Sequence, residues 1–215
     1  MDDSLLNEFS RLCGPDAVLS DPLALLAYEC DALPHLRSSP TMVVLPSSVA
    51  EVQAIVRLCC REGVPFVARG HGTGLSGGAL PVPGGIVIGL SRLNRVLAID
   101  IENRRVTVEP GVTNLEITRQ VAPHGYYYAP DPSSQQVCSI GGNVAENSGG
   151  AHCLKYGFTV HHVLALEAVL PDGEVVHIGS AMADRPGPDL IGLMVGSEGT
   201  LAIVTKAVLR ILRKP

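Results

Sequence analysis

The strongest chemical signal in the sequence is the stretch from 68 to 78, in which five of eleven residues are glycine. It follows the apolar run 64–67, which predicts a buried strand despite Pro65. Glycine reaches positive φ without a steric penalty, so the backbone N–H groups of such a loop can converge on one anion. The spacing therefore indicates a phosphate-binding loop.

Three generic explanations compete for this loop. Residues 72–77 match GxGxxG, but that dinucleotide fingerprint must open a helix, and the prolines within 80–85 prevent a helix from starting there. A Walker loop requires Lys and then Ser or Thr after its last glycine, whereas Gly77 is followed by Gly78. A glycine-rich turn without any ligand stays open for the loop taken alone.

Two further segments share the glycine-rich, uncharged character of this loop. The first lies between Pro130 and Gly150 and contains PDPSS and SIGGNVAENSGG, and the second is GSEGTL at 196–201. Each offers uncharged hydrogen-bond donors on a backbone that can approach a ligand closely. Three such loops on one scaffold fit a long ligand with a phosphate centre and flat polar ends, although each alone could be a turn.

The elements that must position these loops have alternating strand and helix patterns. Two capping boxes, Ser48 with Glu51 and Thr113 with Glu116, predict the starts of two helices. Residues 129–159 have little regular pattern, and an irregular segment of that length in a compact domain indicates function. The other predicted elements are a helical extension over 1–38, helix ends near Gly63 and Gly125, a short helix at 188–194, and strands at 42–46, 85–88, 95–100, 104–109, 163–170, 174–178 and 201–212.

Composition places the chain among globular proteins. Its 215 residues with 46% apolar content suffice for one sizeable domain or two small lobes. Only 17% of the residues are charged, which is below the usual quarter and suggests a face covered by a partner or a further domain. A net charge of −5 with 4% aromatic residues and no tryptophan argues against nucleic acid as a partner.

The cysteines favour a reducing compartment. None of the six belongs to a CxxC motif or to a zinc-type Cys/His spacing, and the chain does not begin with a secretory signal. We therefore expect reduced thiols in a cytoplasmic protein, with Cys59 and its neighbour Cys60 serving core packing rather than redox chemistry. No apolar run approaches the length of a membrane span, and peripheral association through a partner stays open.

Together with the KYG at 155–157, the three loop motifs resemble the FAD-binding domain of the vanillyl-alcohol-oxidase (PCMH) family of flavoenzymes, over about residues 39–215. Within that family the motif sequences are similar to those of the FAD-binding subunits of bacterial glycolate oxidases and of D-lactate and D-2-hydroxyglutarate dehydrogenases. The resemblance implies an α+β fold of two α/β lobes, about 39–98 and 99–215, with FAD between them.

The resemblance also implies which residues hold the cofactor. The pyrophosphate loop would use backbone N–H groups from Gly70 to Gly74 and the Ser76 hydroxyl. The implied FAD-binding residues are, for that loop, Arg69, Gly70, His71, Gly72, Thr73, Gly74, Leu75 and Ser76; for the flavin region, Pro132, Ser133 and Ser134, with Gly141, Gly142, Asn143, Asn147, Gly149 and Gly150 beside the cofactor; and for the adenine and ribose end, Glu198, Gly199 and Ile203.

The histidines affect how the cofactor would be held. Some relatives attach FAD covalently to a histidine at the position of Thr73, so we expect non-covalent FAD here. His71 could still contact a phosphate. We expect His152, His161 and His162 to be structural or exposed, and none has metal-ligand spacing, so no metal site is predicted.

The resemblance implies that this chain carries out only part of a reaction and that a further domain is needed for the rest. Relatives continue beyond the equivalent of Pro215 into a substrate-binding cap that carries the histidine base and any metal ligands, so no catalytic residue is assigned here. The implied function is the FAD-binding portion of a 2-hydroxy-acid oxidoreductase of the glycolate oxidase type, with hydride transfer to flavin N5. Expected partners are the substrate and sister flavin and iron–sulfur subunits at the inner membrane. Alternatives are a non-catalytic FAD-binding remnant or assembly module, or a different flavoenzyme such as a UDP-sugar reductase or cytokinin-type oxidase.

Overall fold

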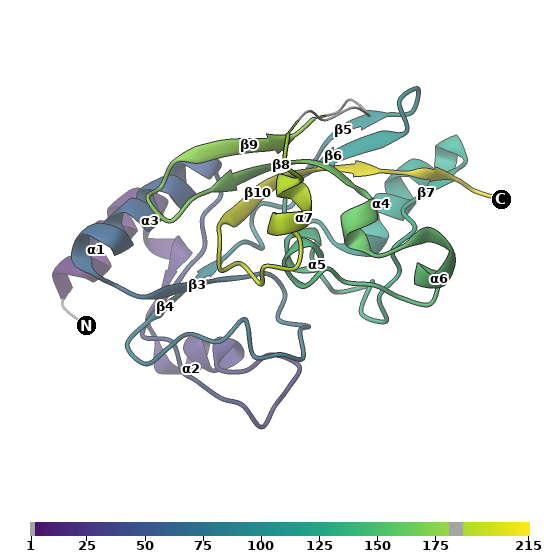
Figure 1. The fold of residues 1–215 in the computed structure, drawn as a ribbon. Coiled ribbons are helices and arrows are strands. Elements are labelled where there is room, and N and C mark those ends of the chain that lie inside the picture. Colours follow the sequence, from purple (N-terminus) through teal and green to yellow (C-terminus); the bar gives the residue numbers. More distant parts are fainter. Residues whose placement is uncertain (1–2, 181–186) are drawn as a thin grey trace.

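The computed structural model describes residues 3–180 and 187–215 and contains two larger sheets, each at the centre of one lobe (Figure 1). The first sheet has the order β1-β2-β4-β3, built from β1 (Val18–Leu19), β2 (Val43–Val44), β4 (Ile86–Gly89) and β3 (Phe66–Arg69). Strands β2, β4 and β3 are parallel, and β1 is antiparallel to β2. The strand expected at 64–67 is thus displaced, and it ends at Arg69 directly before the glycine-rich loop.

Two helices cover the first sheet. Helix α3 (Val49–Glu62) buries Val52, Ile55 and Val56 in one core cluster with strand residues, and α1 (Asp3–Cys13) packs against α3 and buries Phe9 in the same cluster. The first 38 residues, expected to be helical, contain α1, η1 (Pro15–Ala17), β1, α2 (Pro22–Leu25) and η2 (Leu26–Tyr28). This segment therefore contributes both a strand and core side chains to the first lobe.

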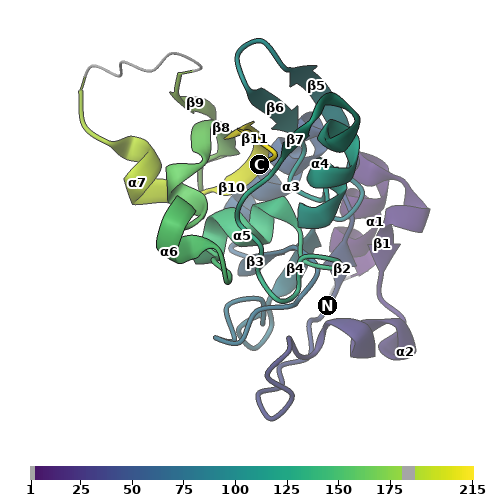
Figure 2. The same ribbon diagram turned by 90° about the vertical axis from the view of Figure 1, so that its right-hand side faces the viewer.

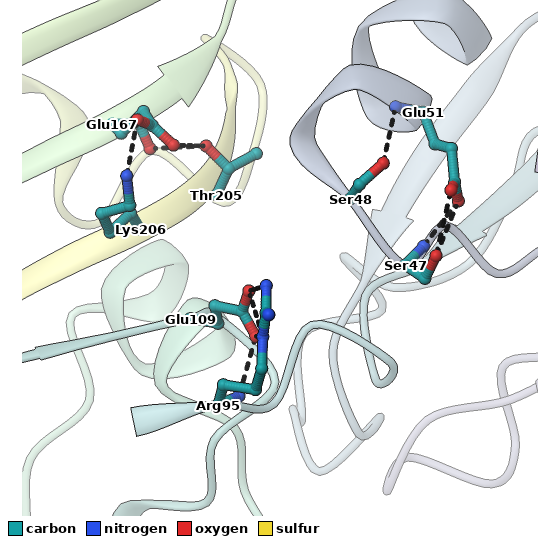
Figure 3. A network of polar contacts seen from close by, with 8 residues as sticks. All are labelled: Ser47, Ser48, Glu51, Arg95, Glu109, Glu167, Thr205 and Lys206. Carbon is teal, nitrogen blue, oxygen red and sulfur yellow. Dashed lines mark hydrogen bonds and ion pairs between the residues drawn. The ribbon is translucent and has the colours of Figure 1, made fainter. Parts of the chain in front are cut away.

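The two predicted capping boxes have different outcomes. At the start of α3, Ser48 Oγ accepts a hydrogen bond from Glu51 N at 3.2 Å, while the Glu51 carboxylate accepts from Ser47 N at 2.7 Å rather than from Ser48 (Figure 3). Gly63 ends the helix in the left-handed conformation with φ 65°. At the start of α4 (Asn114–Val121) Thr113 makes no side-chain cap bond, so that box is wrong.

The second sheet is antiparallel throughout, in the order β5-β6-β10-β8-β9. Its strands are β5 (Val96–Asp100), β6 (Arg105–Val108), β10 (Ile203–Arg210), β8 (Val163–Val169) and β9 (Val175–Gly179). Both predicted hairpins are present. The single strand expected over 201–212 is divided into β10 and β11 (Leu212–Arg213), and β11 pairs with β7 (Tyr126–Tyr127).

Buried carboxylates in this lobe are paired across neighbouring segments. Glu167 on β8 accepts hydrogen bonds from Thr205 Oγ1 at 3.1 Å and Lys206 Nζ at 2.8 Å on β10. Glu109 accepts from Arg95 N at 2.8 Å and from Arg95 Nη2 at 2.7 Å (Figure 3). These pairs satisfy the buried charges and fix the strands that flank the site.

The segment 129–159, expected to lack regular structure, contains two short helices. They are α5 (Ile140–Glu146) and α6 (Cys153–Tyr156), with η3 (Ala122–His124) before the segment, η4 (Thr159–His161) at its end and α7 (Leu190–Met194) further on. Helix α5 holds two adjacent glycines, which lower helix propensity and hide the element from sequence patterns. Tertiary packing overrides that penalty, because Ile140 and Val144 are buried in the core of the second lobe.

The lobes meet where the β8–β9 hairpin packs on α3. Gln53 Nε2 donates to Gly173 O at 2.8 Å, and Cys60 Sγ lies 2.7 Å from Pro171 O. Val169 and Ile203 of the second sheet belong to the core cluster of the first lobe. All six cysteines are free, and Cys59 is buried on the apolar face of α3.

Candidate functional site

The glycine-rich loop leaves β3 above a buried guanidinium. Arg69 is 6% exposed, its Nη2 donates to Cys30 O at 2.7 Å, and its Cζ lies 5.6 Å from the centre of the Tyr28 ring. Burial lowers the pKa of Arg69, and the nearby Asp31 carboxylate opposes that shift. Gly72 has φ 69° and covers the guanidinium so closely that a Cβ there would collide with it. Arg69 therefore supports the loop from beneath.

Most backbone amides of this loop are available to a ligand. Within the described residues, the N–H groups of 71–76 donate to no protein acceptor. The next amide, Gly77 N, donates to Asp31 Oδ2 at 2.9 Å. A run of unpaired N–H groups carries a positive partial charge and stabilises a bound anion.

The opposite wall of the site is the start of α5, which lies between β10 and β3 in the view of Figure 2. Ser139 caps this helix, and its Oγ accepts from Gly142 N at 3.3 Å. A Cβ on Gly70 would collide with Ser139 Oγ, so the loop and the helix are in direct contact. His71 Nδ1 lies 2.6 Å from Val137 O, which joins the two walls a second time.

Asn143 of α5 supplies a buried hydrogen-bond donor. The residue is 1% exposed, and its Nδ2 has no hydrogen-bond partner within the described part of the chain. Leaving such a group unpaired costs about 1–3 kcal/mol, so it is a strong candidate for a ligand contact. Because Asn143 also lines the cavity described next, a ligand acceptor can reach this region.

A cavity of about 340 Å³ lies between the loop and α5, within the usual range for ligand sites. Both lobes contribute to it. The predicted site residues that line it are Arg69, Gly70, His71, Gly72, Thr73, Gly74, Leu75, Ser76, Ser133, Ser134, Gly141, Gly142, Asn143, Glu198, Gly199 and Ile203. The three motif segments are therefore brought to one place.

Four predicted site residues lie elsewhere in the 129–159 segment. Pro132 is buried and is not among the lining residues. Asn147 ends α5 with φ 49°, and its Oδ1 accepts from Val160 N at 3.0 Å. Gly149 and Gly150 pack so tightly against neighbouring residues of the segment that neither has room for a Cβ.

Acidic residues line one end of the cavity. Asp31, Glu146 and Glu198 approach the part of the loop from Gly74 to Gly78. Burial raises the pKa of Glu146, the Glu198 and Asp31 carboxylates raise it further, and the hydrogen bond from Ser76 opposes this. Ser76 Oγ, expected to face phosphates, donates to Glu146 Oε2 at 3.2 Å here.

Sequence reasoning missed two of these acids for different reasons. Glu146 lies inside the SIGGNVAENSGG motif and could have been singled out as its one charged side chain. Nothing in the local pattern connects Asp31 with a loop some forty residues later, because that proximity comes from tertiary packing.

The other histidines lie outside the cavity. His152 Nδ1 is 2.6 Å from Asp131 Oδ2, and His161 Nδ1 accepts from Phe158 N at 3.1 Å. His162 is buried with Nε2 3.0 Å from Tyr156 O, and burial lowers the pKa of its imidazole. No group of three potential metal ligands occurs in the stretches 3–180 and 187–215.

Residues 40–179 match the family described as FAD binding domain. The chain belongs to this family. Its cofactor is FAD, and the predicted α+β FAD-binding fold is confirmed. The solved structure of an alkyldihydroxyacetonephosphate synthase superimposes on 99% of the chain with a TM-score of 0.87 and 26% identity, covering 41% of that protein.

Relatives with named activities cover most of this FAD-binding chain. It is 52% identical over 191 residues to the glycolate oxidase subunit GlcD of Escherichia coli (strain K12), which covers 89% of the chain. It is 38% identical over 180 residues to a D-lactate dehydrogenase of Anaerostipes hadrus, which covers 83%. In both comparisons the chain spans only 38% of the relative's length.

Across the described residues, no helix is both long enough and apolar enough to cross a bilayer.

Proposed function

We propose that this chain is the FAD-binding portion of a flavin-dependent 2-hydroxy-acid oxidoreductase of the glycolate oxidase type. The observation that carries the proposal is the set of unpaired amides at 71–76 in the wall of the inter-lobe cavity. The names of two relatives, a glycolate oxidase subunit and a D-lactate dehydrogenase, support the 2-hydroxy-acid class.

The chemistry of the cavity supports an orientation for the cofactor. The pyrophosphate lies over the loop near Gly72 and Thr73, where N–H groups are free and Arg69 adds positive charge. Carboxylates repel phosphate but accept hydrogen bonds from hydroxyl groups. The acidic end with Glu146 and Glu198 therefore suits the ribose hydroxyls. Asn143 Nδ2 donates to a polar atom of the cofactor.

FAD, when bound, accepts a hydride from the α-carbon of the 2-hydroxy acid. This chain holds and orients the cofactor, and Thr73 stands where a covalent histidine would be, so the attachment is non-covalent. Among the described lining residues the only histidine is His71, whose Nδ1 is already bonded to Val137 O. The base that removes the hydroxyl proton therefore belongs to the portion that the longer relatives have in addition.

The proposal is tested by titrating the purified 215-residue chain with FAD and following flavin fluorescence and absorbance. We expect saturable binding that denaturation reverses, with free FAD released. Absence of binding would overturn the proposed function. Flavin that stays on the denatured polypeptide would contradict non-covalent attachment.

A charge variant tests the placement of the phosphates. Gly72→Asp is unsuitable, because any side chain there collides with the Arg69 guanidinium. Thr73 lines the cavity without such a clash, and Thr73→Asp should raise the Kd for FAD at least about tenfold through like-charge repulsion. The neutral isostere Thr73→Asn is the matched control and should change the Kd less than threefold, about 0.7 kcal/mol. Equal effects would contradict the placement.

The wider assembly follows from the same proposal. We place the chain in a cytoplasmic complex with sister flavin and iron–sulfur subunits, peripheral to the inner membrane, as the word subunit in the name of the relative suggests. The alternative is a non-catalytic FAD-binding remnant or assembly module. Reduction of the bound flavin by glycolate or D-lactate, once the remaining polypeptide is supplied, separates the two, because only the enzyme bleaches the flavin.

A further inference from the structure

The loop is held by a segment that precedes the family match. Residues 28–38, here named the clamp segment, lie before residue 40, where the match begins. Ala32 N donates to Gly74 O at 3.1 Å, and Gly77 N donates to Asp31 Oδ2 at 2.9 Å. The clamp segment thus bonds the loop at two points, on either side of Leu75.

Asp31 is the most constrained side chain of the clamp segment. It is 7% exposed, and its Oδ1 accepts from Leu33 N at 2.8 Å, which leaves Oδ2 directed to Gly77. A carboxylate buried to this degree needs compensating partners. Two backbone N–H groups and the attraction of the buried Arg69 guanidinium provide them.

Arg69 connects the same two parts of the chain from the other side. Its Nη2 donates to Cys30 O in the clamp segment, its Nη1 donates to Ala79 O just beyond the loop at 3.4 Å, and Tyr28 lies against the guanidinium. The cation and the carboxylate therefore form one buried unit under the loop. Neither is an exposed surface charge.

We propose that Asp31 is a positioning residue that holds the loop in its anion-binding conformation, so that the amides of 71–76 are ordered before the cofactor arrives. Ordering a flexible loop at the moment of binding costs conformational entropy and lowers affinity. By fixing Gly74 and Gly77, the clamp segment removes that cost. The inference rests on the proposed FAD-binding role of the loop. The claim that Asp31 orders the loop can be tested without FAD.

The test compares Asp31→Ala with a matched carboxylate that lies away from the loop. Asp21 is exposed and also accepts a backbone hydrogen bond, from Ala24 N at 3.1 Å. For each variant the 215-residue chain is measured by amide hydrogen exchange without FAD and by FAD titration. We expect Asp31→Ala to accelerate exchange at Gly77, Ala32 and Leu33 at least about tenfold, with β4 unchanged, and to raise the Kd for FAD at least about tenfold. Asp21→Ala should change neither.

The outcomes separate the inference from the proposed function. If the unaltered chain binds no FAD, the proposed function is overturned. If it binds FAD but Asp31→Ala leaves both local exchange and Kd unchanged, only the positioning role is overturned. If Asp31→Ala accelerates amide exchange equally in β4, the variant is destabilised as a whole, and the positioning role is likewise overturned. Should Asp31→Ala fail to fold, Asp31→Asn keeps one acceptor oxygen and must show the same local pattern at smaller amplitude.

Discussion

At the scale of single residues, the site combines free donors with crowded acids. Glu146 is the acid most affected by this crowding, because burial and two neighbouring carboxylates disfavour its charged form. Bringing in a diphosphate adds further negative charge nearby. Binding of FAD should therefore be accompanied by proton uptake at this carboxyl group.

The affinity for FAD should therefore depend on pH. Burial and the neighbouring carboxylates hold the pKa of Glu146 above its usual value in the free protein. The negative charge of a bound diphosphate should raise that pKa further, so the affinity for FAD should increase as the pH falls through it. Titrations from about pH 8 to about pH 5 should show the Kd for FAD decreasing. Glu146→Gln, which keeps a hydrogen-bond acceptor for Ser76, should flatten this dependence. An unchanged slope in the variant would assign the dependence to another group.

The sequence indicated the residues that offer hydrogen-bond donors better than the residues that hold the loop in place. The motifs named Gly72, Thr73 and Asn143, and all three line one cavity. Glycine-rich and amide-bearing segments can be recognised from the local sequence, and their role in binding FAD stays a prediction. Ser76 and Asp31 show the limit. The partner of each lies about seventy and about forty-six positions away, and no local spacing encodes contacts at that range.

At the scale of elements, the two capping boxes behave differently despite similar sequence. Ser48 accepts from the amide of Glu51, whereas Thr113 lies beside Ser139 in an isolated antiparallel bridge and caps nothing with its side chain. Sequence specifies the cap residue types, and the packing around each helix decides whether the bond forms. The same reason explains why α5 was not predicted.

These two caps yield a matched pair of substitutions. Ser48→Ala removes a cap bond and should lower the free energy of unfolding by about 1 kcal/mol. Thr113→Ala removes no cap bond and should change it by less than about 0.5 kcal/mol. Urea denaturation of both variants with the unaltered chain is the measurement. A larger loss in Thr113→Ala would mean that its hydroxyl has a role that the helix start does not reveal.

At the scale of the whole molecule, the proposed cofactor site lies where the two lobes meet. Its walls come from the loop after β3 and from α5 with the segment before β10. The lobes already touch there through His71 and Ser76, and they touch again where the β8–β9 hairpin packs on α3. A ligand that fills the cavity would add to these contacts between the lobes. Cofactor binding should stabilise both lobes as one unit.

Thermal unfolding with and without FAD measures this coupling. At an FAD concentration about 100-fold above Kd, linkage adds about 2.7 kcal/mol, which for a chain of this size raises Tm by about 5–10 °C. Both lobes should share the shift in Tm. Single-tyrosine variants can report on each lobe by fluorescence, with Tyr28 in the first lobe and Tyr126, Tyr127 or Tyr128 in the second. All of them should show one transition at the same temperature. Thr73→Asp at the same FAD concentration should lose about half of the shift, because a tenfold higher Kd reduces the linkage contribution to about 1.4 kcal/mol. A shift confined to one lobe would mean that the cofactor contacts only that lobe, and the inter-lobe site would have to be abandoned.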